Sequence, residues 1–116
     1  SYCARIRDNT SSSVTTHGSS HNITAYGELK IEFWFDSSSM ANGDRFDVKV
    51  YNGSSYQTVA SYVSGTDFTD GQMTFKSITV TDAQVNFASN MQVRFECEAP
   101  ANSDRVYLDD IEVSAK

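Results

Sequence analysis

Apolar and polar residues alternate along several short runs of this chain, which is the pattern of a strand with one buried face. The longest such run spans residues 29–35, and the same alternation follows in residues 46–51 and 91–97. The side predicted to be buried consists of Leu29, Ile31, Phe33, Phe35, Phe46, Val48, Val50, Met91, Val93, Phe95 and Cys97. Helical periodicity is nearly absent, so the chain is predicted to be all-β.

Turn residues separate most of these runs and set the number of strands. Residues 42–44, 52–54 and 70–71 combine glycine with asparagine, aspartate or serine, which is turn chemistry. Strands are predicted at 3–7, 22–25, 28–35, 44–51, 58–63, 73–80, 91–98 and 106–113, with a long polar loop at 9–20. About eight short strands without helices favour a two-sheet antiparallel β-sandwich, preferably a jelly roll.

Length and charge narrow the choice of partners. The 116 residues fit a single domain over 1–116, and a hydrophobic content of 39% is enough for one core. No apolar stretch approaches the length of a membrane span. The net charge of −6 argues against a nucleic-acid ligand, because phosphate binding depends on concentrated Lys and Arg. With no visible signal peptide, we expect a mature monomeric domain taken from a larger protein.

Two cysteines lie near the two ends of the domain. Cys3 and Cys97 are predicted to form a disulfide. Closing a loop of about 100 residues contributes roughly 4–5 kcal/mol in the chain-entropy model, and such bonds persist in oxidising compartments. Two buried thiols are the alternative.

The outward positions of the alternating runs carry aromatic rings among charged and amide groups. If the runs are neighbours, Trp34, Tyr51 and Tyr62 share one surface, where flat rings stack against the apolar face of a pyranose. Polar groups on the same surface are suited to sugar hydroxyls, carboxylates or sulfates, and they are Glu32, Asp47, Lys49, Gln92 and Arg94. Cross-strand ion pairs and ordinary ring packing are the alternatives.

Two adjacent acids lie in the last predicted strand. Alternation with Ile111 and Val113 places Asp109 on the core side, where a carboxylate must be paired or bind a metal. Calcium takes six to eight oxygen ligands. Other candidate ligands are Asp110, Asp44, Asn42 and Asp8. Alternatively, Asp109 accepts hydrogen bonds from backbone amides and Asp110 is solvated.

The last two predicted strands resemble a known group of domains. Residues 94–97, followed by Val-Tyr-Leu-Asp-Asp-Ile-Glu-Val at 106–113, are similar to the end of jelly-roll carbohydrate-binding modules and of related adhesin-type and MAM-like domains. Residues 42–62 resemble secreted bacterial modules appended to polysaccharide-degrading enzymes. The resemblance implies a secreted, extracellular domain linked to a catalytic domain, a structural calcium site at Asp109 or Asp110, and a ligand on the concave sheet.

Catalytic arrangements are not indicated. A glycosidase needs two carboxylates across a cleft, and no cleft is implied. His17 and His21 lie in or beside the polar loop, with no nucleophile elbow near them. The first hypothesis is a non-catalytic carbohydrate-binding module that targets an attached enzyme to a polysaccharide, including an anionic (sulfated or uronic) marine or cell-wall glycan. The second is a protein-binding adhesion module of a secreted protease or cell-surface protein. The third is a structural spacer.

Overall fold

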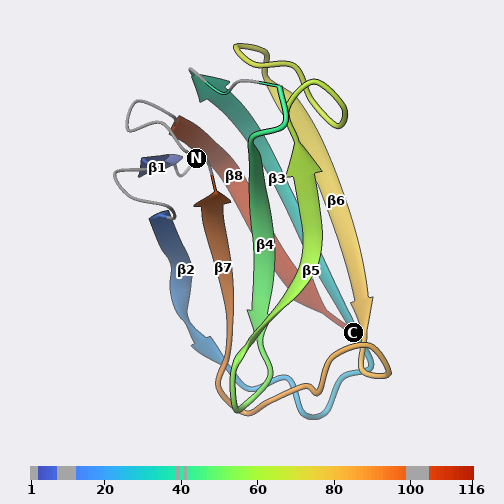
Figure 1. The fold of residues 1–116 in the computed structure, drawn as a ribbon. Coiled ribbons are helices and arrows are strands. Elements are labelled where there is room, and N and C mark those ends of the chain that lie inside the picture. Colours follow the sequence, from blue (N-terminus) through green and yellow to red (C-terminus); the bar gives the residue numbers. More distant parts are fainter. Residues whose placement is uncertain (1–2, 8–12, 39, 41, 99–104) are drawn as a thin grey trace.

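Two four-stranded antiparallel sheets face each other in a computed structural model that describes residues 3–7, 13–38, 40, 42–98 and 105–116 (Figure 1). Sheet I has the strand order β1-β8-β3-β6, and sheet II has the order β2-β7-β4-β5. The strands are β1 (Cys3–Arg7), β2 (Ser13–His21), β3 (Glu28–Ser38), β4 (Arg45–Tyr51), β5 (Tyr56–Val63), β6 (Thr74–Thr81), β7 (Met91–Glu98) and β8 (Arg105–Ala115). This order confirms the predicted jelly-roll β-sandwich.

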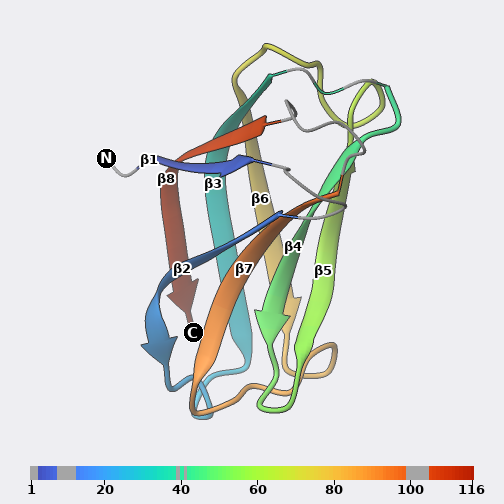
Figure 2. The same cartoon turned by 60° about the vertical axis from the view of Figure 1, so that its left-hand side comes forward.

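The core lies between the two layers, which Figure 2 shows more nearly edge-on. Every position predicted to face inward from β3, β4 and β7 is buried, with at most 2% of its surface exposed. Phe33 contacts Phe46 and Phe95 across the sheets, with ring centroids 6.3 and 5.2 Å apart. Edge-to-face packing of this kind adds to the burial of the rings and fixes how the sheets stack.

Two local predictions are wrong. Residues 22–25 form a turn, in which the Asn22 side-chain oxygen accepts hydrogen bonds from the Thr24 backbone nitrogen and hydroxyl at 3.1 and 2.7 Å. The adjoining polar stretch is β2 from residue 13 onward, while residues 8–12 lie outside the described part. Within the described residues, β2 is an edge strand whose one partner is β7. Its hydrogen bonds to β7 make it a strand, although its sequence lacks the alternation of apolar and polar residues.

Three connections close the lower end of the sandwich in Figure 1, namely β2–β3, β4–β5 and β6–β7. The Ile23 nitrogen donates to the Ala88 carbonyl at 3.2 Å, and the Asn86 amide donates to the Asn52 carbonyl at 3.0 Å. Gly53 turns the β4–β5 hairpin with a φ of 99°, as the turn chemistry predicted. These bonds hold the ends of β4 and β5 against the start of β7.

The described residues contain no helix, and therefore none that is long and apolar enough to cross a membrane.

The predicted disulfide between Cys3 and Cys97 is not tested, because the Cys3 side chain lies outside the described part. The Cys3 backbone pairs with Asp109 in sheet I, and the buried Cys97 pairs with Phe46 in sheet II. The disulfide therefore stays a prediction.

Candidate functional site

The predicted ligand-binding residues do not share one surface. Glu32 and Trp34 lie on β3 in sheet I, whereas Asp47, Lys49, Tyr51, Gln92 and Arg94 lie on β4 and β7 in sheet II. All of these positions alternate with buried core residues, so each group points away from the core on its own sheet. The assumption that β3 is a neighbour of β4 and β7 is therefore wrong, and the outer faces are two separate candidate surfaces.

Tyr62 was expected on the outer surface, and this prediction is wrong. The register shifts between Val48 and Lys49, where β5 contains one extra residue, and Tyr62 pairs with Phe46. Its ring packs against the core rings of Phe35 and Phe46, at 6.2 and 5.2 Å. Burial and, to a smaller extent, the negative charge of Asp67 raise the pKa of Tyr62 to about 12. Tyr62 is therefore a half-buried residue that packs against the core.

Asp47 does lie on the outer face of sheet II, yet its side chain is only 5% exposed. It accepts a hydrogen bond from the Ser61 hydroxyl at 2.6 Å and lies 3.4 Å from the Arg45 guanidinium. A carboxylate so enclosed has little surface left for a ligand. The hydrogen bond from Ser61 on β5 indicates a role in holding β4 and β5 together.

Aromatic and amide side chains gather where β4, β5 and β7 meet at the lower end of sheet II. The rings of Tyr51 and Tyr56 are cross-strand partners with centroids 5.1 Å apart. The Tyr56 hydroxyl donates to the Gln92 side-chain oxygen at 3.1 Å, and the Arg94 guanidinium lies over the Tyr56 ring at 3.5 Å. We call Tyr51, Tyr56, Gln92 and Arg94 the tyrosine cluster. It adjoins an open hollow lined by Ser20, Tyr51, Tyr56, Asn90 and Gln92.

Tyr56 was missed because the strand was predicted to start at residue 58, which left this tyrosine in the preceding turn. The structure extends β5 back to Tyr56. A signal was present, since Tyr51 and Tyr56 flank a four-residue turn that contains Asn52 and Gly53. Such a turn pairs the residues on its two sides, so it would have placed the second ring beside the first.

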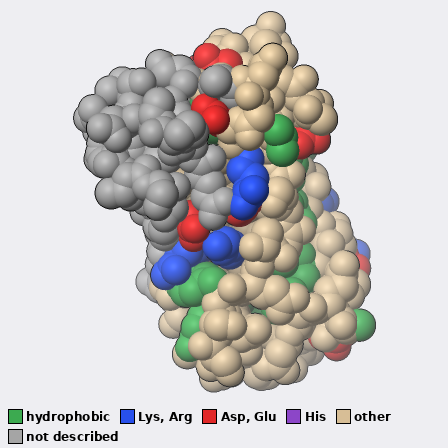
Figure 3. Space-filling model, viewed as in Figure 1, with side chains coloured by type: hydrophobic (Ala, Val, Ile, Leu, Met, Phe, Trp, Pro, Cys, Tyr) green, Lys and Arg blue, Asp and Glu red, His purple; other side chains and the backbone are tan. Residues whose placement is uncertain are grey.

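Positive side chains occupy the middle of the face seen in Figure 3, close to acidic ones. The Lys49 ammonium lies 3.1 Å from a Glu96 carboxylate oxygen, so this charge is balanced within the sheet. No carboxylate within the described residues pairs with Arg94, and its Nε is buried without a hydrogen-bond partner. Arg94 is thus the cation of the tyrosine cluster that remains available for an anionic group.

The acids of the last strand lie on sheet I. Asp109 pairs with Trp34, and the register between β3 and β8 then shifts at Asp110, which has a φ of 50°. This bulge turns Asp109 to the outer face, so the prediction that its carboxylate faces the core is wrong. Asp109 accepts a hydrogen bond from the Asp110 nitrogen at 2.9 Å, which is the alternative considered from the sequence.

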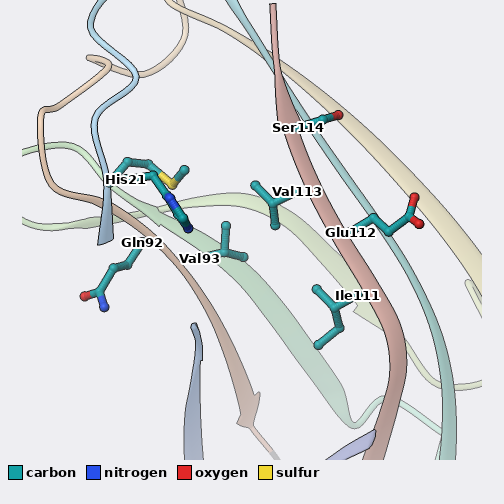
Figure 4. Close-up of a pocket in the computed structure, with 8 residues that line it drawn as sticks. His21, Gln92, Val93, Ile111, Glu112, Val113 and Ser114 are labelled. Carbon is teal, nitrogen blue, oxygen red and sulfur yellow. The ribbon is translucent and has the colours of Figure 1, made fainter. Parts of the chain in front are cut away.

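An open hollow of about 410 Å³ also lies at the edge of the sandwich, between β7 and β8 (Figure 4). Val93, Ile111 and Val113 point into it, while the side chains of Gln92 and Glu112 point away. His21 lies at its rim. Its lining residues include no Trp, Tyr or Phe on which a sugar ring could stack, so this hollow is the weaker candidate for a carbohydrate.

The fold of this chain is similar to those of several solved sugar-binding domains. The chain is similar to the N-terminal cellulose-binding domain of β-1,4-glucanase C from Cellulomonas fimi, with a TM-score of 0.57, 15% identity and coverage of 98% of this chain and 77% of that one. It is also similar to the CBM22-1 xylan-binding domain from Paenibacillus barcinonensis, with a TM-score of 0.55, 14% identity and coverage of 96% and 81%. The likeness is one of fold.

The sugar-binding C-terminal domain of EclA is similar as well, with a TM-score of 0.62, 6% identity and coverage of 97% of this chain and 77% of that one. No protein-family model and no curated protein sequence matches the chain. At such identities the comparisons establish the β-sandwich architecture and leave the function to be argued from the site.

Proposed function

We propose that this chain is a non-catalytic carbohydrate-binding module that binds a polysaccharide on the outer face of sheet II. The observation that carries the proposal is the tyrosine cluster, in which two neighbouring rings lie beside an open hollow. Flat aromatic surface binds the apolar face of a sugar ring, and the amides of Asn90 and Gln92 supply donors and acceptors for hydroxyls. The sugar ligands named for the structurally similar domains support this choice.

The site is better suited to a chain of sugars than to a single sugar. The hollow is open, and its lining residues come from β2, the last residue of β4, the first residue of β5, and the start of β7 with Asn90 just before it. Bonds among the lower connections hold these elements in place before a ligand arrives. A preformed surface loses little conformational entropy on binding.

Arg94 extends the proposal to anionic polysaccharides. Its guanidinium is stacked at 3.5 Å on the ring of Tyr56, and Tyr56 lines the hollow. A guanidinium so placed can bond a uronic carboxylate or a sulfate through two parallel donors. A neutral glycan uses the same rings without this contact, so replacing Arg94 separates the two classes.

The broader setting is proposed from the fold. A binding module without catalytic groups acts by keeping an attached enzyme close to an insoluble substrate, which raises the effective concentration of that substrate. We therefore propose a secreted, extracellular, monomeric domain covalently linked to a polysaccharide-degrading catalytic domain.

A structural calcium ion belongs to the same proposal. No group of three or more Asp, Glu, His or Cys side chains comes together within the described part of the chain. Asp44 precedes β4 and its carbonyl accepts a hydrogen bond from Ser64 at the β5 end of sheet II, while Asp109 and Asp110 lie on the outer face of sheet I. Asp109 stays the proposed ligand.

The test is a titration of the domain with matched glycans. The neutral set is cellohexaose, xylan, mannohexaose and β-1,4-galactotriose, and the anionic set is polygalacturonate and a sulfated galactan. We expect Tyr56→Ala to weaken binding about tenfold or more, equivalent to ~1.4 kcal/mol, because it removes a stacking surface and the support of Arg94. Tyr56→Phe keeps the ring and should retain most of the affinity.

Trp34→Ala is the matched control, since it removes a larger ring from the opposite sheet. Arg94→Gln should weaken binding of anionic glycans and leave neutral ones unchanged. Equal losses in Tyr56→Ala and Trp34→Ala, or no binding to any glycan, would overturn the proposal. In the latter case a protein-binding adhesion module becomes the leading account.

A further inference from the structure

The outer face of sheet I carries two exposed aromatic rings that the proposed sugar site does not use. Trp34 and Phe75 are cross-strand partners on β3 and β6, with centroids 5.3 Å apart. They are 41% and 44% exposed, although the residues beside Trp34 in the chain, Phe33 and Phe35, are fully buried. Single exposed apolar residues are common, but a contiguous pair of large rings indicates a surface that receives a ligand.

Carboxylates surround these rings. A hollow beside them is lined by Glu32, Trp34, Phe75, Asp110 and Glu112, so three of its five residues are acids and none is Lys or Arg. Lys30 lies next to Glu32 at 3.7 Å and offsets part of one charge. The bulge at Asp110 brings that residue out to the surface. The hollow beside the rings therefore has a net negative charge.

We propose that this face is a second ligand site, which binds a glycan chain of protonated amino sugars. The indole and phenyl rings offer a stacking surface for the pyranose, and the carboxylates of Glu32 and Glu112 bond its ammonium groups. A cation near the face of an aromatic ring is attracted by the ring as well as by the acids. A uronic or sulfated chain is repelled by the same carboxylates, so the two faces select for opposite charges.

The shape of the face favours a polymer over a small amine. The two rings are tilted by 52° and lie side by side along the sheet, so they form no enclosed cage for a single ammonium group. Acids lie on β3 and on β8. Successive sugars of an extended chain can therefore meet a ring and a carboxylate in turn.

The experiment compares three hexamers with the same β-1,4 backbone, which carry an amine, an acetamide or a hydroxyl at the second carbon. These are the glucosamine hexamer, the N-acetylglucosamine hexamer and cellohexaose, titrated in a buffer acidic enough to keep the amines protonated. We expect the glucosamine hexamer to bind about tenfold or more tightly than its acetylated form through this face, because acetylation removes the positive charge. Added salt should weaken this binding.

Three variants locate the site. Trp34→Ala should remove the preference for the glucosamine hexamer over its acetylated form, and Glu112→Gln should weaken that preference while leaving the ring surface intact. Both residues are exposed, so the fold is expected to survive, as a melting curve can verify. Tyr56→Ala is the control on sheet II and should leave the preference for the amine form over the acetylated form unchanged, which separates a failure here from a failure of the sheet II site.

The proposal is wrong if the glucosamine hexamer does not bind, if the acetylated and amine forms bind equally, or if Trp34→Ala and Glu112→Gln bind like the parent. A lysine hexapeptide serves as the remaining probe. If the peptide binds through Trp34 and the glucosamine hexamer does not, the face is a docking surface for basic protein segments and the amino-sugar assignment fails.

Discussion

Asp47 tests whether a buried carboxylate of sheet II stabilises the fold or serves a ligand. Replacing it with alanine removes the hydrogen bond from Ser61 at 2.6 Å and the contact with the half-exposed Arg45 at 3.4 Å. A hydrogen bond to a charged group is worth about 1.5–3 kcal/mol, and an exposed ion pair adds about 0–1 kcal/mol. We therefore expect Asp47→Ala to lower the free energy of unfolding by about 2–3 kcal/mol. Glycan affinity should not change, because only 5% of the side chain is exposed.

Urea unfolding followed by circular dichroism measures this loss, together with Ser61→Ala and the double variant. Because both single changes break the same bond, the double-mutant cycle should show a coupling energy of about 1–2 kcal/mol. A coupling energy near zero, or a loss of less than about 0.5 kcal/mol in Asp47→Ala, refutes the structural role. If Asp47→Ala lowers glycan affinity without changing stability, Asp47 is a ligand-binding residue.

Three other predictions test the core, a turn and the metal. The Tyr62 hydroxyl keeps its proton up to about pH 12 in the folded state, whereas an unfolded chain releases this proton above pH 10. The free energy of unfolding should therefore fall as the pH rises from 10 to about 12. Tyr62→Phe should lose less stability over this range, as measured by the urea midpoints. Gly65 and Gly71 both have positive φ, at 86° and 83°, but an added Cβ at Gly65 would lie 2.5 Å from the Asn42 side chain whereas Gly71 has open space. In thermal unfolding, Gly71→Ala should lower the free energy of unfolding by about 1 kcal/mol, and Gly65→Ala should lower it by about 1–2 kcal/mol more. Equal losses in the two variants would contradict the steric argument. A chelator should lower the melting temperature if calcium is structural, and an unchanged curve removes the ion from the account.

Alternation along β3, β4 and β7 was enough to predict the core, because a strand with one buried face repeats every two residues. It identified Phe33, Phe46 and Phe95, which meet at the centre of the sandwich. The same pattern says which residues point outward but not on which sheet they lie. In a jelly roll the consecutive strands β3 and β4 belong to opposite sheets, so Trp34 and Tyr51 face away from each other.

Bulges account for the other errors in the candidate site. One extra residue in β5 turned Tyr62 into the core, and a register shift at Asp110 turned Asp109 outward. An inserted residue reverses the face to which every later residue of the strand points. The sequence around the bulge does not show where this extra residue lies, because that depends on the pairing with the partner strand. The position of a bulge depends on contacts between strands that are far apart in the chain.

The most direct test of the proposed function is to map the tightest-binding glycan of the titration series onto the sheets by nuclear magnetic resonance. Backbone amide shifts are recorded while the glycan is added to the unmodified domain. The account predicts that the largest shifts cluster on Tyr51, Tyr56, Gln92 and Arg94, at the lower end of sheet II. Shifts centred on β3 and β6, or on the hollow between β7 and β8, would contradict it.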